Sequence, residues 1–125
     1  MRDTPIRSIM VIDDDADARR SLREFLTSEG FTVQTARDGQ HALNVLERIR
    51  PPDLILLDYK MPVMDGKQFL GVLRRNPLLQ GIPVVILSAA TREWSGANLE
   101  VVDVLTKPVD LDLLLSTVRG IFTAS

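Results

Sequence analysis

The sequence predicts an α/β fold, a three-layer sandwich in which helices cover both faces of a five-stranded parallel sheet. Three unbroken apolar runs carry this prediction, because strands without polar alternation are typical of a sheet covered on both faces. These runs are Ile9–Ile12, Leu54–Leu57 and Val84–Leu87. Between them the apolar residues recur with helical spacing, so strand and helix alternate along the chain. This alternation predicts parallel strands joined by right-handed crossovers.

Two further segments are expected to complete the sheet as its edges. Phe31–Thr35 alternates apolar and polar residues, which is typical of a strand covered on one side only. Val101–Leu105 is apolar apart from Asp103, and we interpret it as the opposite edge.

One helix is expected after each strand. Four apolar stripes with helical spacing support this: Ala18, Leu22, Phe25 and Leu26; Ala42, Leu43, Leu46 and Ile49; Phe69, Leu70 and Leu73; and Leu111, Leu114, Leu115, Val118 and Phe122. Gly30 and Pro51–Pro52 are expected to end the first two helices. Asp65 and Asp110 are expected to cap the start of the third and the last.

The segment Thr91–Glu100 should form the fourth helix, but its pattern is the weakest. It contains Gly96, and Trp94 and Leu99 are the main apolar residues that could face a core. The arginines of the first helix, Arg19, Arg20 and Arg23, are expected to form a solvated helix face.

Composition restricts the classes of protein that this chain can represent. Its 125 residues predict one domain over 1–125, with an ordered core of about 7–123. A formal net charge of −2, from 17 acidic and 15 basic residues, predicts no general attraction to nucleic acid or to an anionic membrane. The chain has no cysteine, which excludes disulfides and thiolate metal sites. No apolar run approaches the roughly 20 residues of a membrane span.

From the same observations we expect a soluble, cytoplasmic protein. Because the chain ends one helix after its last predicted strand, we also expect that no output domain is attached.

Polar residues follow four of the five predicted strands, at the edge where open α/β sheets bind their ligands. These residues are Asp13, Asp14 and Asp15 after the first strand, Asp58 after the third, Ser88 after the fourth and Lys107 after the fifth. Each of them alone could be a helix cap, a turn residue, a buried hydroxyl or a surface charge. Together, the carboxylates would raise one another's pKa unless a cation bound among them, and oxygen ligands favour a hard ion such as Mg²⁺.

This set of groups suits phosphoryl transfer. A carboxylate can attack phosphorus and form an aspartyl phosphate, and the transition state requires mainly positioning and charge neutralisation. A divalent cation, a lysine ammonium and a hydroxyl could each contact one phosphoryl oxygen.

Four short blocks contain these residues: Val11–Asp15, Leu57–Gly66, Val85–Ala89 and Thr106–Pro108. In order and spacing they resemble the sequence blocks of two-component receiver domains, in particular the single-domain regulators of chemotaxis. The resemblance extends over essentially the whole chain. It implies a flavodoxin-like fold with strand order 2-1-3-4-5.

The resemblance also implies a metal site. Asp14 resembles the carboxylate that binds Mg²⁺ directly, and Asp13 resembles one that acts largely through water. Asp58 and the backbone carbonyl of Lys60 would complete the protein ligands.

Roles in phosphorylation follow from the same resemblance. Asp58 resembles the phospho-acceptor, Ser88 the hydroxyl that moves to the phosphoryl group, and Lys107 the residue that pairs with the phosphorylated aspartate. The Lys107–Pro108 peptide is expected to be cis. Val104 stands where relatives often have a tyrosine or phenylalanine that switches rotamer.

As a member of this family, the chain is expected to act as a switch in a two-component phosphorelay. A histidine kinase or phosphotransfer protein would donate the phosphoryl group, and the chain would catalyse only its own phosphorylation and dephosphorylation. A downstream protein would bind the fourth helix, the fifth strand and the fifth helix. No nucleic acid or membrane partner is expected.

Two other function classes remain as alternatives. A phosphatase resembling haloacid dehalogenases would use an aspartate nucleophile, but such enzymes usually have a second acid two residues later, where this chain has Lys60. An unphosphorylated interaction module would be favoured by loss of Asp58, Asp14 or Lys107, yet all three are present.

Overall fold

Five strands form one parallel sheet in the computed structural model, which describes residues 7–89 and 101–123. The strands are β1 (Ser8–Ile12), β2 (Thr32–Ala36), β3 (Leu54–Asp58), β4 (Val84–Ser88) and β5 (Asp103–Thr106). Their order is β2-β1-β3-β4-β5, which confirms the order that the resemblance implied, with the two expected edges. All four pairs of neighbouring strands are parallel.

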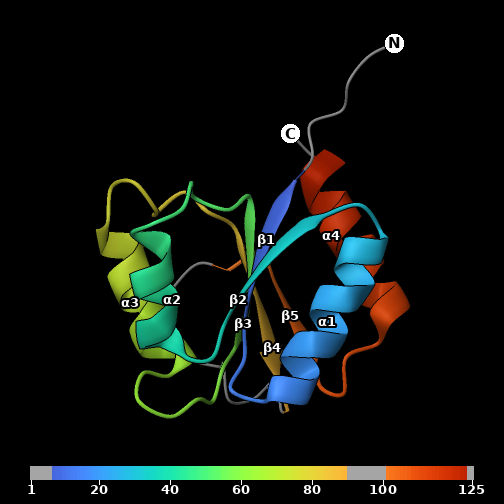
Figure 1. Ribbon diagram of the computed structural model, residues 1–125, viewed down its shortest axis with the longest axis horizontal. Coiled ribbons are helices and arrows are strands. Elements are labelled where there is room, and N and C mark those ends of the chain that lie inside the picture. Colours follow the sequence, from blue (N-terminus) through green and yellow to red (C-terminus); the bar gives the residue numbers. More distant parts are fainter. Residues whose placement is uncertain (1–6, 90–100, 124–125) are drawn as a thin grey trace.

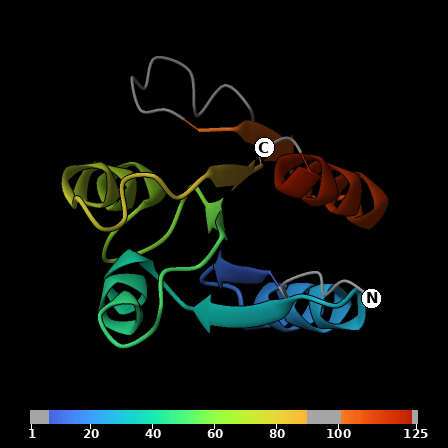
Figure 2. The same ribbon diagram turned by 90° about the horizontal axis from the view of Figure 1, so that it is seen from above.

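Helices cover both faces of this sheet, so the three-layer prediction is confirmed. The described helices are α1 (Ala16–Ser28), α2 (Gly39–Leu46), α3 (Gly66–Arg75) and α4 (Leu111–Thr123). Figures 1 and 2 show α1 and α4 on one face and α2 and α3 on the other. The helix α4 is the last of the predicted helices. The predicted fourth helix at Thr91–Glu100, which includes Trp94 and Gly96, lies outside the described residues.

Alternate residues of the central strands pack into two cores, one on each face of the sheet. The core beneath α2 and α3 includes Met10, Ile12, Ile55, Leu57, Val84, Ile86, Phe69, Leu70 and Leu73. The core beneath α1 and α4 includes Ile9, Val11, Leu54, Leu56, Val85, Leu87, Leu22, Leu26, Leu114 and Val118. The apolar runs in the sequence are therefore unbroken because each strand is buried on both faces.

The helix ends follow the chemistry expected from the sequence. Asp65 caps α3 in a reciprocal capping box with Gln68, and the Asp110 carboxylate accepts the backbone N–H of Leu113 at the start of α4. Gly30, just beyond α1, has a φ of 99°, which glycine adopts without steric cost. No helix in the described ranges is long and apolar enough to cross a membrane.

Some predicted boundaries were wrong by a few residues. Phe31 precedes β2, because its N–H bonds the Leu26 carbonyl at the end of α1. Helix α2 ends at Leu46, so Pro51–Pro52 does not end it, and Ile49 lies beyond it but still packs against the core. Val101 precedes β5, which begins at Asp103.

Candidate functional site

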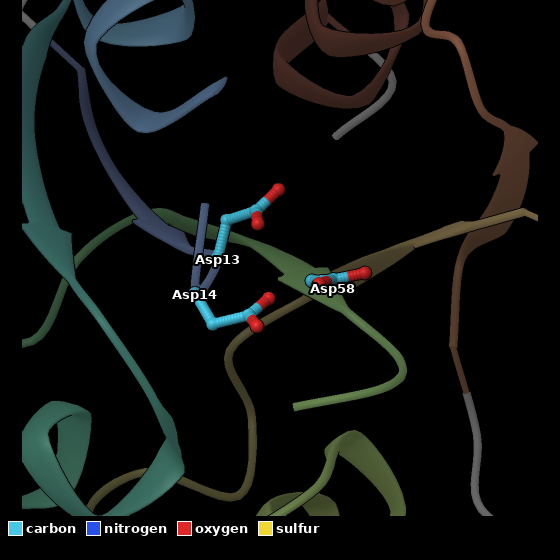
Figure 3. Close-up of side chains that lie close together, drawn as sticks. All are labelled: Asp13, Asp14 and Asp58. Atoms are coloured by element: carbon cyan, nitrogen blue, oxygen red, sulfur yellow. The ribbon is translucent and has the colours of Figure 1, made fainter. Parts of the chain in front are cut away.

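Three carboxylates meet at the carboxyl edge of the sheet. Asp13 and Asp14 lie in the loop between β1 and α1, and Asp58 is the last residue of β3. Because β1 and β3 are paired with Ile12 opposite Leu57, the residues that follow come side by side. One carboxylate oxygen from each aspartate lies within 4.8 Å of the others (Figure 3). The structure thus brings together three residues that the sequence predicted as a site.

The Asp13 side chain is fully buried, and both its oxygens are bonded. Oδ1 accepts the backbone N–H of Asp15 at 2.9 Å, and Oδ2 accepts Nζ of Lys107 at 3.0 Å. The Asp14 side chain is exposed, and its carboxylate points toward the same space as the carboxylates of Asp13 and Asp58 (Figure 3).

Lys107 connects the buried carboxylates. It follows β5, and its Nζ lies 3.0 Å from Asp13 Oδ2 and 3.0 Å from Asp58 Oδ1. Its backbone N–H bonds the carbonyl of Ser88 at 2.7 Å, and the peptide to Pro108 is cis, as the resemblance implied. The interpretation of Lys107 as a solvated surface charge is therefore wrong.

The electrostatics of the cluster raise two pKa values. Burial and the negative charge of Asp13 together raise the pKa of Asp58 to about 6, although Lys107 opposes both effects. Burial alone would lower the pKa of Lys107, but its bonds to Asp13 and Asp58 outweigh that effect and raise it. Two buried carboxylates thus share one ammonium group, which leaves an excess of negative charge in the site.

The other two predicted site residues lie on neighbouring segments. Ser88 is buried and ends β4, whose Leu87 pairs with Asp58 in the sheet. Lys60 is exposed and lies in the loop two residues beyond Asp58. Its carbonyl as a metal ligand stays a prediction.

The loop that follows Asp58 is tightly built. Val63 has a φ of 69°, and the N–H of Met64 bonds the Pro62 carbonyl at 2.7 Å across it. A Cβ added to Gly66 would lie 3.0 Å from the Tyr59 Cα, so only glycine fits there without a shift. Sequence reasoning did not assign these positions individually, although the Leu57–Gly66 block contains them.

Arg19 was misinterpreted from the sequence. Instead of belonging to a solvated face, its guanidinium Nη1 donates a 2.7 Å hydrogen bond to the backbone carbonyl of Asp13. Helical spacing marks Arg19 as a residue of the first turns of α1, but it does not show that the side chain reaches back to the preceding loop. Arg20 and Arg23 are exposed as expected.

Comparison with known proteins identifies the class. The family model of the response regulator receiver domain matches residues 9–119, and the chain belongs to this family. Receiver domains function in two-component phosphorelays, where phosphorylation on aspartate and dependence on Mg²⁺ are general features. They interact with histidine kinases and downstream effectors.

Three particular proteins illustrate the similarity. An uncharacterized 14.6 kDa protein of Leptolyngbya boryana is 41% identical over 109 residues, covering 82% of this chain and 79% of that protein. Response regulator MprA of Mycolicibacterium vanbaalenii is 35% identical over 120 residues, covering 94% of this chain and 50% of MprA. The chain thus spans half the length of this longer regulator. The structure of chemotaxis response regulator CheY4 of Vibrio cholerae superposes with a TM-score of 0.85 at 28% identity, covering 94% of this chain and 99% of CheY4.

Proposed function

We propose that Asp58 accepts the phosphoryl group in this chain, with Mg²⁺ held by Asp13, Asp14, Asp58 and the Lys60 carbonyl. The observation that carries the proposal is the group of three carboxylates within 4.8 Å, with Lys107 paired to two of them. In this arrangement the proposed acceptor, Asp58, lies beside the carboxylates that would bind the cation and beside the ammonium group of Lys107.

The residues present fit a hard divalent cation. Carboxylate oxygens are the ligands that Mg²⁺ prefers, and this cluster has an excess of negative charge. Because both oxygens of Asp13 already have partners, Asp14 and Asp58 are the direct carboxylate ligands in our proposal, and Asp13 contributes through water. The bound ion would neutralise charge on the transferring phosphoryl group.

In the proposed reaction a carboxylate oxygen of Asp58 forms a bond to phosphorus while the bond from phosphorus to the donor's imidazole nitrogen breaks. The electron pair of the broken bond stays on that nitrogen, which then takes up a proton. Lys107, already 3.0 Å from Asp58 Oδ1, is positioned to pair with the added phosphoryl oxygens. The Ser88 hydroxyl would contact another of these oxygens.

The raised pKa of Asp58, about 6, still lies below neutral pH. Most molecules therefore have the nucleophilic carboxylate at pH 7, and its oxygen is more basic than that of an ordinary aspartate.

The donor in this proposal is a histidine kinase or a phosphotransfer protein, and the location is the cytoplasm. The chain would catalyse only its own phosphorylation and dephosphorylation. A downstream protein would bind the surface formed by residues 91–100, β5 and α4. The exposed apolar side chains of Val102, just before β5, and of Leu113, on α4, support the described part of this surface.

The test is phosphorylation by acetyl phosphate with Mg²⁺, measured by intact-protein mass spectrometry. We expect one added phosphoryl group, which Asp58→Asn or a chelator prevents. Asp53→Asn, the same substitution at the opposite end of β3, is the matched control and should be labelled normally. Equal labelling of Asp58→Asn would refute the assignment.

A further inference from the structure

The loop that presents the acidic residues is fixed by contacts from three elements. The N–H of Asp13 donates to the Ala36 carbonyl at the end of β2, and its side chain bonds Asp15 and Lys107. The remaining polar group of the residue, its backbone carbonyl, accepts the 2.7 Å bond from Arg19. All the hydrogen-bonding groups of Asp13 are therefore engaged, and its carbonyl is bonded by the charged guanidinium of Arg19.

We infer that Arg19 is a positioning residue for the metal-binding carboxylates. The carbonyl that it holds belongs to the peptide between Asp13 and Asp14, so this bond fixes the plane from which the Asp14 side chain projects. Asp14 is exposed, so the orientation of this peptide has a large influence on where its carboxylate lies. The inference rests on the proposed function, because it assigns Asp14 as a metal ligand.

Two possible roles of Arg19, as a nearby positive charge or as a group that orients the loop, predict opposite changes in Mg²⁺ affinity when it is removed. If the guanidinium acted only as a nearby positive charge, its removal would lessen repulsion and strengthen Mg²⁺ binding. If it orients the loop, its removal should weaken binding, as loss of groups that orient metal ligands typically does by about 10–100-fold. The sign of the change therefore separates the two roles.

Arg20 offers a matched control on the same helix. Its guanidinium pairs with the exposed Asp17 of the same helix. Arg20→Met removes the same charge one residue away, while Arg19→Met removes both the charge and the bond to the Asp13 carbonyl. Arg19→Lys keeps the charge and one donor and should rescue part of the effect.

The experiment has two measurements on the full chain. Mg²⁺ affinity is measured by titration followed by NMR, and the exchange of the Asp15 backbone amide with solvent is measured without metal. We expect Arg19→Met to bind Mg²⁺ about tenfold more weakly and to exchange the Asp15 amide faster, because that amide bonds the Asp13 carboxylate. Arg20→Met should change neither, and Arg19→Lys should fall between wild type and Arg19→Met.

Unchanged or tighter Mg²⁺ binding by Arg19→Met would overturn the inference, as would an equal effect of Arg20→Met. If wild-type protein binds no Mg²⁺, the proposed metal site fails instead. In that case unchanged exchange of the Asp15 amide in Arg19→Met would still overturn the positioning role, and faster exchange would support it. Thermal unfolding of each variant shows whether the changes are local.

Discussion

The two ends of β3 place aspartates in opposite circumstances. At the amino end, Asp53 accepts the backbone N–H of Ser8 at 2.8 Å and also its hydroxyl at 3.4 Å. The Asp53 N–H in turn bonds the Ser8 side chain and backbone. At the carboxyl end, Asp58 faces two other carboxylates and shares one lysine with Asp13. Asp53 is hydrogen-bonded by neutral donors, whereas Asp58 lies beside two other carboxylates that repel its charge.

This difference separates a structural carboxylate from a reactive one. Asp53 joins β1 to the start of β3, and its bonds complete the hydrogen bonding of the sheet end. Asp58 has a raised pKa because it is buried and lies beside the like charge of Asp13, and a bound cation could balance this negative charge. Substitutions at the two ends of β3 should therefore affect phosphorylation differently and change stability in opposite directions.

The largest effect is expected at Lys107. We predict that Lys107→Ala folds and binds Mg²⁺ but loses the response to the phosphate mimic beryllofluoride. A charge-assisted bond to a buried anion contributes about 2 kcal/mol, so affinity for the mimic should fall at least about tenfold. Amide chemical shifts recorded during a beryllofluoride titration measure this response.

The same variant has a second, independent readout. Because Lys107 opposes the rise in the Asp58 pKa, its removal should raise that pKa above about 6 in metal-free protein. Carboxyl ¹³C shifts across a pH titration would show it. A Lys107→Ala protein that responds fully to beryllofluoride is incompatible with the proposed role.

The next effect concerns stability at the carboxyl end. The pKa of Asp58 rises from 3.8 to about 6 on folding, so the folded chain binds a proton more tightly than the unfolded chain. Stability is therefore lost as pH rises from about 4 to 6. Asp58→Asn removes this penalty and should stabilise metal-free protein by about 3 kcal/mol at pH 7, since each pKa unit corresponds to 1.36 kcal/mol.

Urea unfolding at several pH values in a chelator tests this expectation. The stability gained by Asp58→Asn should shrink toward pH 4, because Asp58 of the folded wild-type protein is then protonated and uncharged, as asparagine is. If the two proteins differ in stability by the same amount at every pH, the titration of Asp58 is not the source of the difference.

A smaller effect of opposite sign is expected at the amino end. Asp53→Asn keeps an acceptor for the Ser8 N–H but replaces a charge-assisted bond with a neutral one. We predict a loss of stability of about 0.5–1 kcal/mol at pH 7, with phosphorylation unchanged. Parallel urea unfolding of the two Asn variants compares the ends directly. If both variants shift stability in the same direction, the contrast between the two ends is wrong.

The sequence predicts the sheet well and the tertiary contacts poorly. Fully buried strands leave a direct signature, as in Leu54–Leu57, and residues just past parallel strands must share one edge. The sequence alone therefore predicts that Asp13 and Asp58 lie together. Arg19 could not be placed, because helical periodicity describes faces and not the reach of a long side chain into a neighbouring loop. Position relative to the strand distinguishes Asp58 from Asp53, but it does not show that Asp53 bonds Ser8.

The last prediction tests whether the loop that follows the carboxyl end of β3 has a strained backbone. Val63 lies in the loop after Asp58 with a φ of 69°, a region that β-branched residues rarely adopt, and its side chain is 80% exposed. Val63→Gly loses little buried surface and relieves this conformation, so we expect stability to rise by about 0.5–1 kcal/mol. Val63→Ala keeps a Cβ and should gain less. Urea unfolding of both variants measures the difference. A destabilised Val63→Gly protein would mean that the entropy lost on ordering glycine exceeds the strain relieved, and that the loop is not strained to this extent.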